Sequence, residues 1–287
     1  MDNGSAPGRV TIREDVVFGK GGGRDLRCDV YVPPGEVRDA PAVLLLHGGA
    51  WRSGDRKQLR GYGVLLGREG YVCVASEYRL TPEEDWPAQI HDAKAALRWM
   101  RANAGELGID PEKIAVEGNS AGGHLSLMLA ATPGVEAFEG DGGSAGVPTH
   151  VAAAVGVYPP TLISHGERER GAVLALGLFG DNGSAELAAA ASPLTYVGPE
   201  FPPTMLIHGT GDATVPPLAS VLMYEALVKA GVPVELHMYA ETPHAFDALP
   251  AFGRQCSAEM RLFLDRYVRD RALATAAARP GGARDVG

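Results

Sequence analysis

The chain has little of what marks disulfide-stapled, membrane-spanning or nucleic-acid-binding proteins. Its three cysteines are an odd number without a C-x-x-C pair, which indicates neither a disulfide framework nor a zinc site. No run of about 18 apolar residues is present, so we expect no membrane span. Asp and Glu number 35 against 26 Lys and Arg, and the net charge of −9 argues against nucleic-acid binding through clustered basic residues.

Cofactor and targeting motifs are absent as well. The sequence has no G-x-x-x-x-G-K-[ST] and no H-E-x-x-H, and its "GKGGG" run does not fit the dinucleotide fingerprint. The opening "MDNGSAPGRV" lacks the apolar core of a signal peptide. We therefore expect no cofactor and no metal, and a cytoplasmic protein, or a secreted one if a leader has been removed.

What is present is ordinary globular composition over 287 residues, with 45% hydrophobic and 21% charged residues. This length can bury a sizeable core. Residues 10–18 and 26–32 mix alternation with β-branched residues, and the turn-prone "GKGGGRD" separates them. They predict an antiparallel pair of strands at the start of the fold. Cys28 and Cys73 lie in strand-like runs, where a thiol packs as a small buried hydrophobe.

The middle of the chain alternates apolar runs with helical stretches. The runs are short and suit strands buried on both faces, as parallel sheets require; they cover residues 41–47, 71–78, 113–119, 151–158, 203–209 and 233–240. Helices are predicted at 87–105, with an apolar stripe, at 121–131, at 217–231, with Gly231 as its cap, and at 257–274. This order predicts an α/β fold, a mostly parallel central sheet with helices on both faces.

The segment 159–202 breaks this rhythm, because an ordinary connection between strand and helix has about 2–6 residues. We expect it to form a small lid insertion over the carboxyl edge of the sheet. The tail, residues 276–287, is expected to be disordered. The whole chain, 1–287, is then a single domain with one insertion.

Ser120 stands out in "VEGNSAGGHLSLMLA", where an apolar strand turns into a helix. Gly118-Asn119-Ser120-Ala121-Gly122 fits G-x-S-x-G, the nucleophile elbow, in which a sharp turn exposes the serine hydroxyl. The alternative is a glycine-rich turn whose serine only caps the helix. The pattern alone is weak, since glycine, serine and alanine are common.

A serine hydroxyl becomes nucleophilic when a base accepts its proton. His244, in the loop after the last strand, is the candidate base, although alone it would be read as a surface histidine. Asp212 follows the strand 203–209 and is the candidate acid that orients the imidazole, although it could also cap the next helix. The order Ser120, Asp212, His244, each after its own strand, is typical of α/β-hydrolases. Glu241 and Asp247 are competing acids close to His244 in sequence.

An oxyanion hole needs backbone N–H donors that face the reacting carbonyl. In "LLLHGGAWRSGD" a strand ends in a glycine-rich loop, which could be an ordinary turn or such a site. With Ser120 downstream we favour the site, with donors from Gly49, Ala50 and Ala121. Trp51 of the same loop is expected to wall the substrate pocket together with the lid.

Several motifs resemble one family when they are taken together. "HGGAW", "EYRLTPEEDWPAQIHDAKAALRW", "GNSAGGHL", "SPLTYV", "IHGTGD" and "TPHAF" run in order from about residue 10 to 268. They resemble serine carboxylesterases of the α/β-hydrolase superfamily, between the hormone-sensitive-lipase-like esterases and the bacterial acetyl-xylan and feruloyl esterase-like group. The resemblance implies the triad Ser120, Asp212 and His244 and the oxyanion donors Gly49, Ala50 and Ala121.

Two departures bear on the finer grouping. Lipase-like members usually have Asp at the position of Asn119 and a third glycine at that of Ala50. Their N-terminal helical cap has no room here, because strands already occupy residues 10–32. Both departures favour the xylan-ester-like group.

The sequence therefore predicts an enzyme that cleaves small carboxylic esters, with a preference for short acyl groups, through an acyl-enzyme. An N-formyl amidase of the kynurenine-formamidase type is the alternative, since the same triad would serve it. A non-catalytic binding protein of this fold typically lacks a triad residue, and all three are present here. The natural ester and the oligomeric state stay open.

Overall fold

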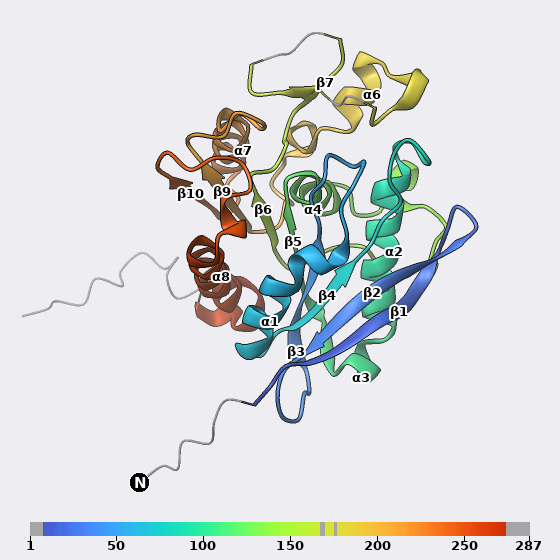
Figure 1. Cartoon of the computed structure of the whole chain (residues 1–287), viewed down its shortest axis with the longest axis vertical. Coiled ribbons are helices and arrows are strands. Elements are labelled where there is room, and N and C mark those ends of the chain that lie inside the picture. The colour runs from blue at the N-terminus through green and yellow to red at the C-terminus, as the bar shows by residue number, and fades with distance from the viewer. Residues whose placement is uncertain (1–7, 167–169, 175–176, 274–287) are drawn as a thin grey trace, which may run out of the picture.

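A twisted sheet of eight strands, in the order β1-β2-β4-β3-β5-β6-β9-β10, runs through the computed structural model (Figure 1). The structure describes residues 8–166, 170–174 and 177–273. The strands are β1 (Thr11–Gly21), β2 (Arg24–Val32), β3 (Ala40–Leu46), β4 (Val72–Ser76), β5 (Ile109–Asn119), β6 (Ala154–Val157), β9 (Thr204–Gly209) and β10 (Val234–Tyr239). β2 is antiparallel to both β1 and β4, and every other neighbouring pair is parallel. The predicted antiparallel opening pair and the mostly parallel sheet are thus confirmed.

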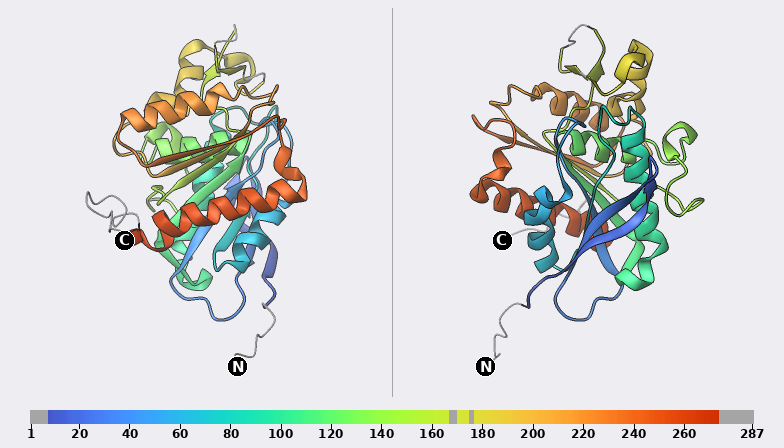
Figure 2. Two further views of the ribbon diagram at one scale, coloured as in Figure 1. Left: turned by 90° about the vertical axis from the view of Figure 1, so that its left-hand side faces the viewer. Right: turned by 45° about the vertical axis from the view of Figure 1, so that its right-hand side comes forward.

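Helices cover both faces of this sheet (Figure 2). α1 (Arg60–Arg68) and α8 (Pro250–Leu264) pack against each other and share one hydrophobic cluster with Val43 and Leu45 of β3. α2 (Ala88–Ala102), α4 (Ala121–Ala131) and α7 (Leu218–Lys229) belong to a second cluster, with Leu44 and Leu46. Successive β3 side chains therefore enter opposite cores, which is why the strand reads as continuously apolar.

Shorter elements join these layers. They are η1 (Arg56–Leu59), α3 (Ala104–Leu107), α5 (Glu136–Glu139), β7 (Ile163–Ser164), β8 (Val173–Leu174), η2 (Gly180–Asn182), α6 (Ala185–Ala190), η3 (Pro193–Tyr196), η4 (Phe246–Ala248) and the π-helical turn η5 (Asp265–Arg269). β7 and β8 form a separate parallel pair.

Sequence periodicity located most of the long helices. The apolar stripe of α2 is fully buried, and it comprises Ile90, Ala93, Ala96, Leu97 and Met100. Gly231 takes a φ of 76° just after α7, and its N–H donates to the Val228 carbonyl, as a helix cap requires. α8 begins at Pro250, ahead of the predicted start at 257. α1 was not predicted, because three glycines interrupt its pattern.

The segment 159–202 follows β6 and contains β7, β8, η2, α6 and η3. Figure 1 shows it at the top of the molecule, and η3 contacts both α4 and α7. Its residues 167–169 and 175–176, and the tail 276–287, lie outside the described residues. The lid, the single domain and the disordered tail therefore stay predictions.

The structure also bears on the state of the cysteines and on membrane-spanning helices. All three cysteines are buried and free, and the burial of Cys28 and Cys73 was predicted from their strand-like settings. In the described ranges, no helix combines the length and apolarity needed to cross a membrane.

Candidate active site

Ser120 lies on a strained turn between β5 and α4. Its φ of 54° and ψ of −118° are unusual for a residue with a side chain, and such strain persists where the surroundings enforce it. The Ser120 N–H donates to the Val157 carbonyl at 2.8 Å. A Cβ added to Gly122 would lie 1.9 Å from the Leu46 carbonyl oxygen, so only glycine lets α4 approach the end of β3. This is the strand–turn–helix elbow that the motif predicts.

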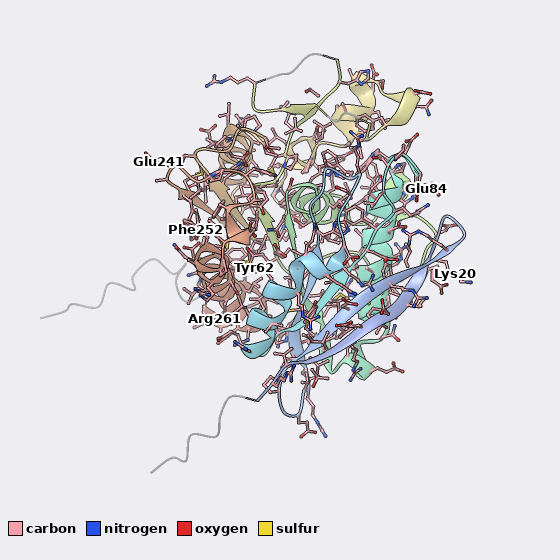
Figure 3. All side chains as sticks on the ribbon, in the orientation of Figure 1. Lys20, Tyr62, Glu84, Glu241, Phe252 and Arg261 are labelled. Carbon is pink, nitrogen blue, oxygen red and sulfur yellow. The ribbon has the colours of Figure 1, made fainter. Side chains whose placement is uncertain are left out.

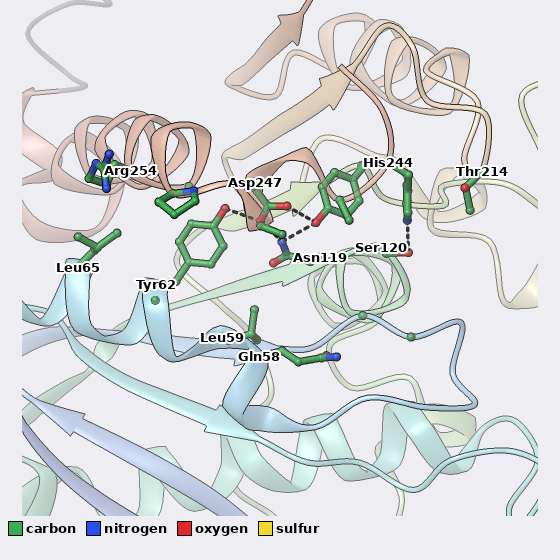
Figure 4. A pocket seen from close by; sticks show the side chains of 18 of the residues that line it. Gln58, Leu59, Tyr62, Leu65, Asn119, Ser120, Thr214, His244, Asp247 and Arg254 are labelled. Carbon is green, nitrogen blue, oxygen red and sulfur yellow. Dashed lines mark hydrogen bonds between the residues drawn. The ribbon is translucent and has the colours of Figure 1, made fainter. Parts of the chain in front are cut away.

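The structure brings Ser120, His244 and Asp212 together in one hydrogen-bonded chain. His244 Nδ1 lies 2.6 Å from Asp212 Oδ2, and His244 Nε2 lies 2.9 Å from Ser120 Oγ (Figure 4). Because a carboxylate only accepts, Nδ1 carries the imidazole proton and Nε2 is left to accept from the serine hydroxyl. The three residues follow β5, β9 and β10, whose parallel carboxyl ends meet at one edge of the sheet.

Asp212 is held as an anion. Its side chain is fully buried, and Oδ1 accepts from the N–H groups of Thr214 and Val215 at 2.8 and 2.9 Å. His208 Nε2 lies 3.3 Å from Oδ2. Burial by itself would raise the pKa of Asp212, but the hydrogen bonds from His208, His244 and Val215 outweigh burial and lower it. His208 therefore helps to keep this carboxylate charged.

Neither of the two competing acids pairs with the catalytic histidine candidate. Asp247 accepts hydrogen bonds from Tyr62 Oη at 2.8 Å, from Asn119 Nδ2 at 2.6 Å and from Tyr158 Oη. Glu241 is exposed, and its backbone N–H donates to Thr210 Oγ1. Neither carboxylate has a hydrogen bond to His244 in the part of the chain that the structure covers.

The loop after β3 presents backbone N–H groups beside the elbow. Gly49 has a φ of 125°, and a Cβ there would lie 2.0 Å from the Ser53 carbonyl oxygen, so the turn requires glycine. Its carbonyl accepts from the N–H groups of Arg52 and Ser53, which closes the turn. The N–H groups of Gly49, Ala50 and Ala121 have no acceptor among the described residues. They are free to bind an oxygen from a ligand.

Trp51 does not lie where the sequence placed it. Only 4% of the residue is exposed, and its Nε1 donates to His124 Nδ1 under the loop. Among the described residues that line the cavity at Ser120, this loop is represented by Gly48, Gly49, Ala50 and Ser53. The positive φ of 53° at Ala50 and 60° at Trp51 turns the indole inward, so it supports the loop instead of walling the pocket.

A cavity of about 970 Å³ opens beside Ser120 and His244. One wall comes from η1 and α1, and the other from the chain that follows His244 into α8 (Figure 4). Figure 3 shows Tyr62 of α1 close to α8, which carries Phe252. No described residue of the segment 159–202 lines this cavity. The prediction that the lid helps to wall the acyl pocket stays a prediction.

Backbone strain gathers around this cavity. Of the eight non-glycine residues with positive φ in the described ranges, four line it: Ala50, Ser120, Tyr158 and Ala245. Such conformations cost about 1–3 kcal/mol each and cluster at functional sites. The strain at Ala50, Tyr158 and Ala245 is independent support for the site, because it does not depend on the serine motif.

Sequence reasoning missed the polar floor of the cavity. Asn119 Nδ2 donates to Tyr158 Oη at 2.9 Å as well as to Asp247, which joins the elbow to the loop after His244. The Tyr158 ring also lies against the His244 ring, with centroids 4.5 Å apart. The unusual Asn119 was the only sequence signal for this network.

For metals, the described residues contain no group of three or more His, Cys, Asp or Glu side chains that could hold an ion.

Comparison with known families decides the membership of this chain. The BD-FAE family model matches residues 28–227, well over half of the sequence. The chain belongs to the BD-FAE family. The match takes in Gly49, Ala50, Ser120 and Asp212, whereas His244 lies beyond it.

Curated relatives of this BD-FAE member carry esterase names. Probable carboxylic ester hydrolase LipM of Mycobacterium tuberculosis is 34% identical over 220 residues, which cover 73% of this chain and 50% of that protein. Esterase LipQ of the same organism is 33% identical over 246 residues, 81% of this chain and 57% of that protein. The chain thus spans between about half and three fifths of the length of these relatives.

Solved structures agree on the fold. A truncated carbohydrate esterase from gut microbiota has a TM-score of 0.81 at 26% identity, with 93% of this chain and 99% of that chain covered. Esterase Est2 of Thermogutta terrifontis has a TM-score of 0.75 at 28% identity, with 93% and 95% covered. Another similar structure is that esterase phosphorylated by paraoxon. The BD-FAE member therefore has the α/β-hydrolase fold that the sequence predicted.

Proposed function

We propose that this BD-FAE member hydrolyses carboxylic esters, with Ser120 as nucleophile, His244 as general base and Asp212 as the acid that orients the imidazole. The observation that carries the proposal is the hydrogen-bonded chain from Asp212 through His244 to Ser120 Oγ. Its three members come from three different strand ends, and the free hydroxyl opens onto a cavity. The esterase names of the relatives support the same reaction class.

The geometry suits a two-step acyl transfer. Ser120 Oγ attacks the ester carbonyl carbon while its proton moves to His244 Nε2. The tetrahedral intermediate collapses, the bond to the alcohol oxygen breaks, and the alcohol leaves with that proton. A water molecule then attacks the acyl-Ser120 carbonyl, gives a proton to His244, and releases the acid and the free serine. Asp212 stays ionised throughout and stabilises the imidazolium.

The oxyanion hole is proposed from the N–H groups of Gly49, Ala50 and Ala121. All three are unpaired in the described structure and lie beside the serine elbow. Ala121 is the first residue of α4, where the positive end of the helix dipole favours a developing negative charge. Fixed donors of this kind stabilise the transition state without reorganising.

We also propose that the acyl groups are short, such as acetyl or butyryl. His244 must hand its proton to the departing alcohol oxygen, so the alcohol part lies on the side of His244. The chain that follows His244 forms one of the two walls of the cavity of about 970 Å³, and on that ground we assign the cavity to the alcohol part.

A substrate panel with covalent labelling tests the reaction class. The panel comprises p-nitrophenyl esters of rising acyl length, acetylated xylan, methyl ferulate and N-formylkynurenine. We expect ester cleavage, and we expect paraoxon, which phosphorylates the Thermogutta relative, to stop it by adding one phosphoryl group to Ser120. Turnover confined to N-formylkynurenine would favour the amidase alternative, and a label on another residue would refute the nucleophile assignment.

A further inference from the structure

Two arginines mark the end of the cavity that is remote from the serine. Arg254 of α8 and Leu65 of α1 lie across the pocket from Ser120 (Figure 4). Gly61, Tyr62, Leu65 and Arg68 of α1 all line the cavity, and their spacing places them along one face of the helix. The cavity thus runs from the serine along α1 towards two guanidinium groups.

These two arginines differ from others on the same helices. Arg60 of α1 is paired with Glu14, and Arg261 of α8 is paired with Asp265, and neither arginine lines the cavity. Within the described residues, Arg68 and Arg254 have no ion pair and no side-chain hydrogen bond. Both arginines are exposed, and in a chain with a net charge of −9 two unpaired cations that line one cavity make its surroundings locally favourable for an anion.

The one carboxylate among the described lining residues does not compete for them. Asp247 already accepts from Tyr62, Asn119 and Tyr158, so its charge is stabilised inside the floor of the cavity. The remaining wall between the serine and the arginines includes Leu59, Leu65 and Pro250. An apolar chain fits this stretch, with polar contacts at its two ends.

We infer that the cavity takes esters of alcohols that carry a carboxylate at the end remote from the ester oxygen, and that Arg68 and Arg254 bind this carboxylate. The inference rests on the proposed esterase function and adds the class of alcohol. A guanidinium group binds a carboxylate through paired hydrogen bonds, so it binds a carboxylate more tightly than a neutral amide. The helical rise per residue places Arg68 about 10 Å along α1 from Gly61. A long ω-hydroxy acid therefore spans the cavity better than a short one.

The test uses acetate esters that differ only in the charge of the alcohol part. Acetylated ω-hydroxyoctanoate is compared with the corresponding neutral amide and with the corresponding ammonium compound, and released acetate is measured. The butanoate and hexanoate homologues report on length. Monoethyl suberate and its neutral monoamide carry the variable group on the acyl side, so they separate the acyl part from the alcohol part; ethanol is the product measured for these two. Hydrolysis of p-nitrophenyl acetate reports the esterase activity itself.

For wild-type protein we expect kcat/KM for the octanoate to exceed that for its amide by about tenfold, with the ammonium compound slowest. The preference should grow from butanoate to octanoate and shrink as salt rises from about 0.05 to about 0.5 M. The double variant Arg68→Gln/Arg254→Gln should lose the preference for the carboxylate over the amide. The matched double variant Arg60→Gln/Arg261→Gln removes the same charge from the same helices outside the cavity, and should keep it.

The outcomes separate the two levels of the proposal. The inference would be overturned by equal kcat/KM for the octanoate, its amide and its ammonium counterpart, or by a preference for the carboxylate that survives in the Arg68/Arg254 variant. Cleavage of p-nitrophenyl acetate would still support the esterase function in either case. A carboxylate preference found only with monoethyl suberate would overturn the assignment to the alcohol part. Loss of the preference in the Arg60/Arg261 variant would show a general charge effect, which also refutes the site. No cleavage of any ester would refute the function, and the inference with it.

Discussion

The indole Nε1 of Trp51 donates a hydrogen bond to Nδ1 of His124 at 3.1 Å, and this bond fastens the loop after β3 to α4, the helix that follows Ser120. Since Nδ1 accepts, the imidazole proton is on Nε2, which lies 2.6 Å from the Ala191 carbonyl oxygen. One buried neutral histidine therefore joins the loop with the proposed oxyanion donors, the elbow helix and the segment after α6.

The charge state of His124 predicts a pH dependence of stability. Burial lowers its pKa from 6.5 to about 4. Above about pH 6.5 His124 is neutral in both the folded and the unfolded protein. Between about pH 6.5 and 4 it binds a proton only in the unfolded protein, and below about pH 4 it does so in both. This histidine should therefore cost stability as the pH falls through that window, by about 3 kcal/mol in total. In His124→Gln, urea unfolding at pH 7 and pH 4.5 should show a smaller loss than in wild type; equal losses would contradict the assignment.

Replacement of the nucleophile gives the most direct test of the site. Ser120→Ala should retain the fold, because the hydroxyl has no structural partner other than His244 among the described residues. Ester turnover should fall by at least about 10⁴-fold. Activity with p-nitrophenyl butyrate, together with circular dichroism, provides the measurement. Normal turnover in a folded variant would mean that another group attacks the ester.

The carboxylates near His244 should differ sharply in their effect on kcat. Asp212→Asn should lower kcat by about 10⁴-fold, as the equivalent change does in a serine protease, partly because the imidazole then adopts the wrong tautomer. Glu241→Gln and Asp247→Asn should each cost less than about tenfold, since neither carboxylate bonds to His244. A folded Glu241 or Asp247 variant as damaged as the Asp212 variant would show that the acid is misassigned.

Acyl length provides a further prediction. Because the large cavity is assigned to the alcohol part, kcat/KM should be higher for butyryl than for palmitoyl p-nitrophenyl esters. Detergent must be held below its micelle concentration and be identical in both assays, so that substrate aggregation does not set the result. The opposite order would place a long acyl channel at Ser120.

Glycine substitutions test why the elbow is so crowded with small residues. Gly122→Ala should destabilise the protein by more than about 2 kcal/mol, because its Cβ would meet the Leu46 carbonyl at 1.9 Å. Gly61→Ala is the matched control, since a Cβ there meets nothing within 4 Å, and it should raise helix stability by about 0.5–1 kcal/mol. Unfolding curves in urea compare the two. Equal stability of both variants would contradict the packing of the elbow.

Much of this architecture is local and could be predicted from the sequence by itself. The spacing of apolar residues predicted the long strands and most of the long helices, because it shows whether one face or both faces of a single element are buried. The elbow at Ser120 and the cap at Gly231 followed from turn chemistry. The shared edge for Ser120, Asp212 and His244 followed from their places after parallel strands. These properties depend on neighbours within a few residues, or on the direction of the strands.

The surroundings of that edge depend on long-range packing. Asp212 and Asp247 have the same side chain, and the choice between them depends on which one the fold turns towards the His244 imidazole. The cavity is walled by α1 and the start of α8, which lie far apart in sequence and meet only because both pack on one face of the sheet. Trp51 turned inward because two consecutive positive φ values rotate the loop onto His124. Side-chain direction and long-range packing depend on contacts that no local pattern contains, and for this protein they define the cavity beside Ser120.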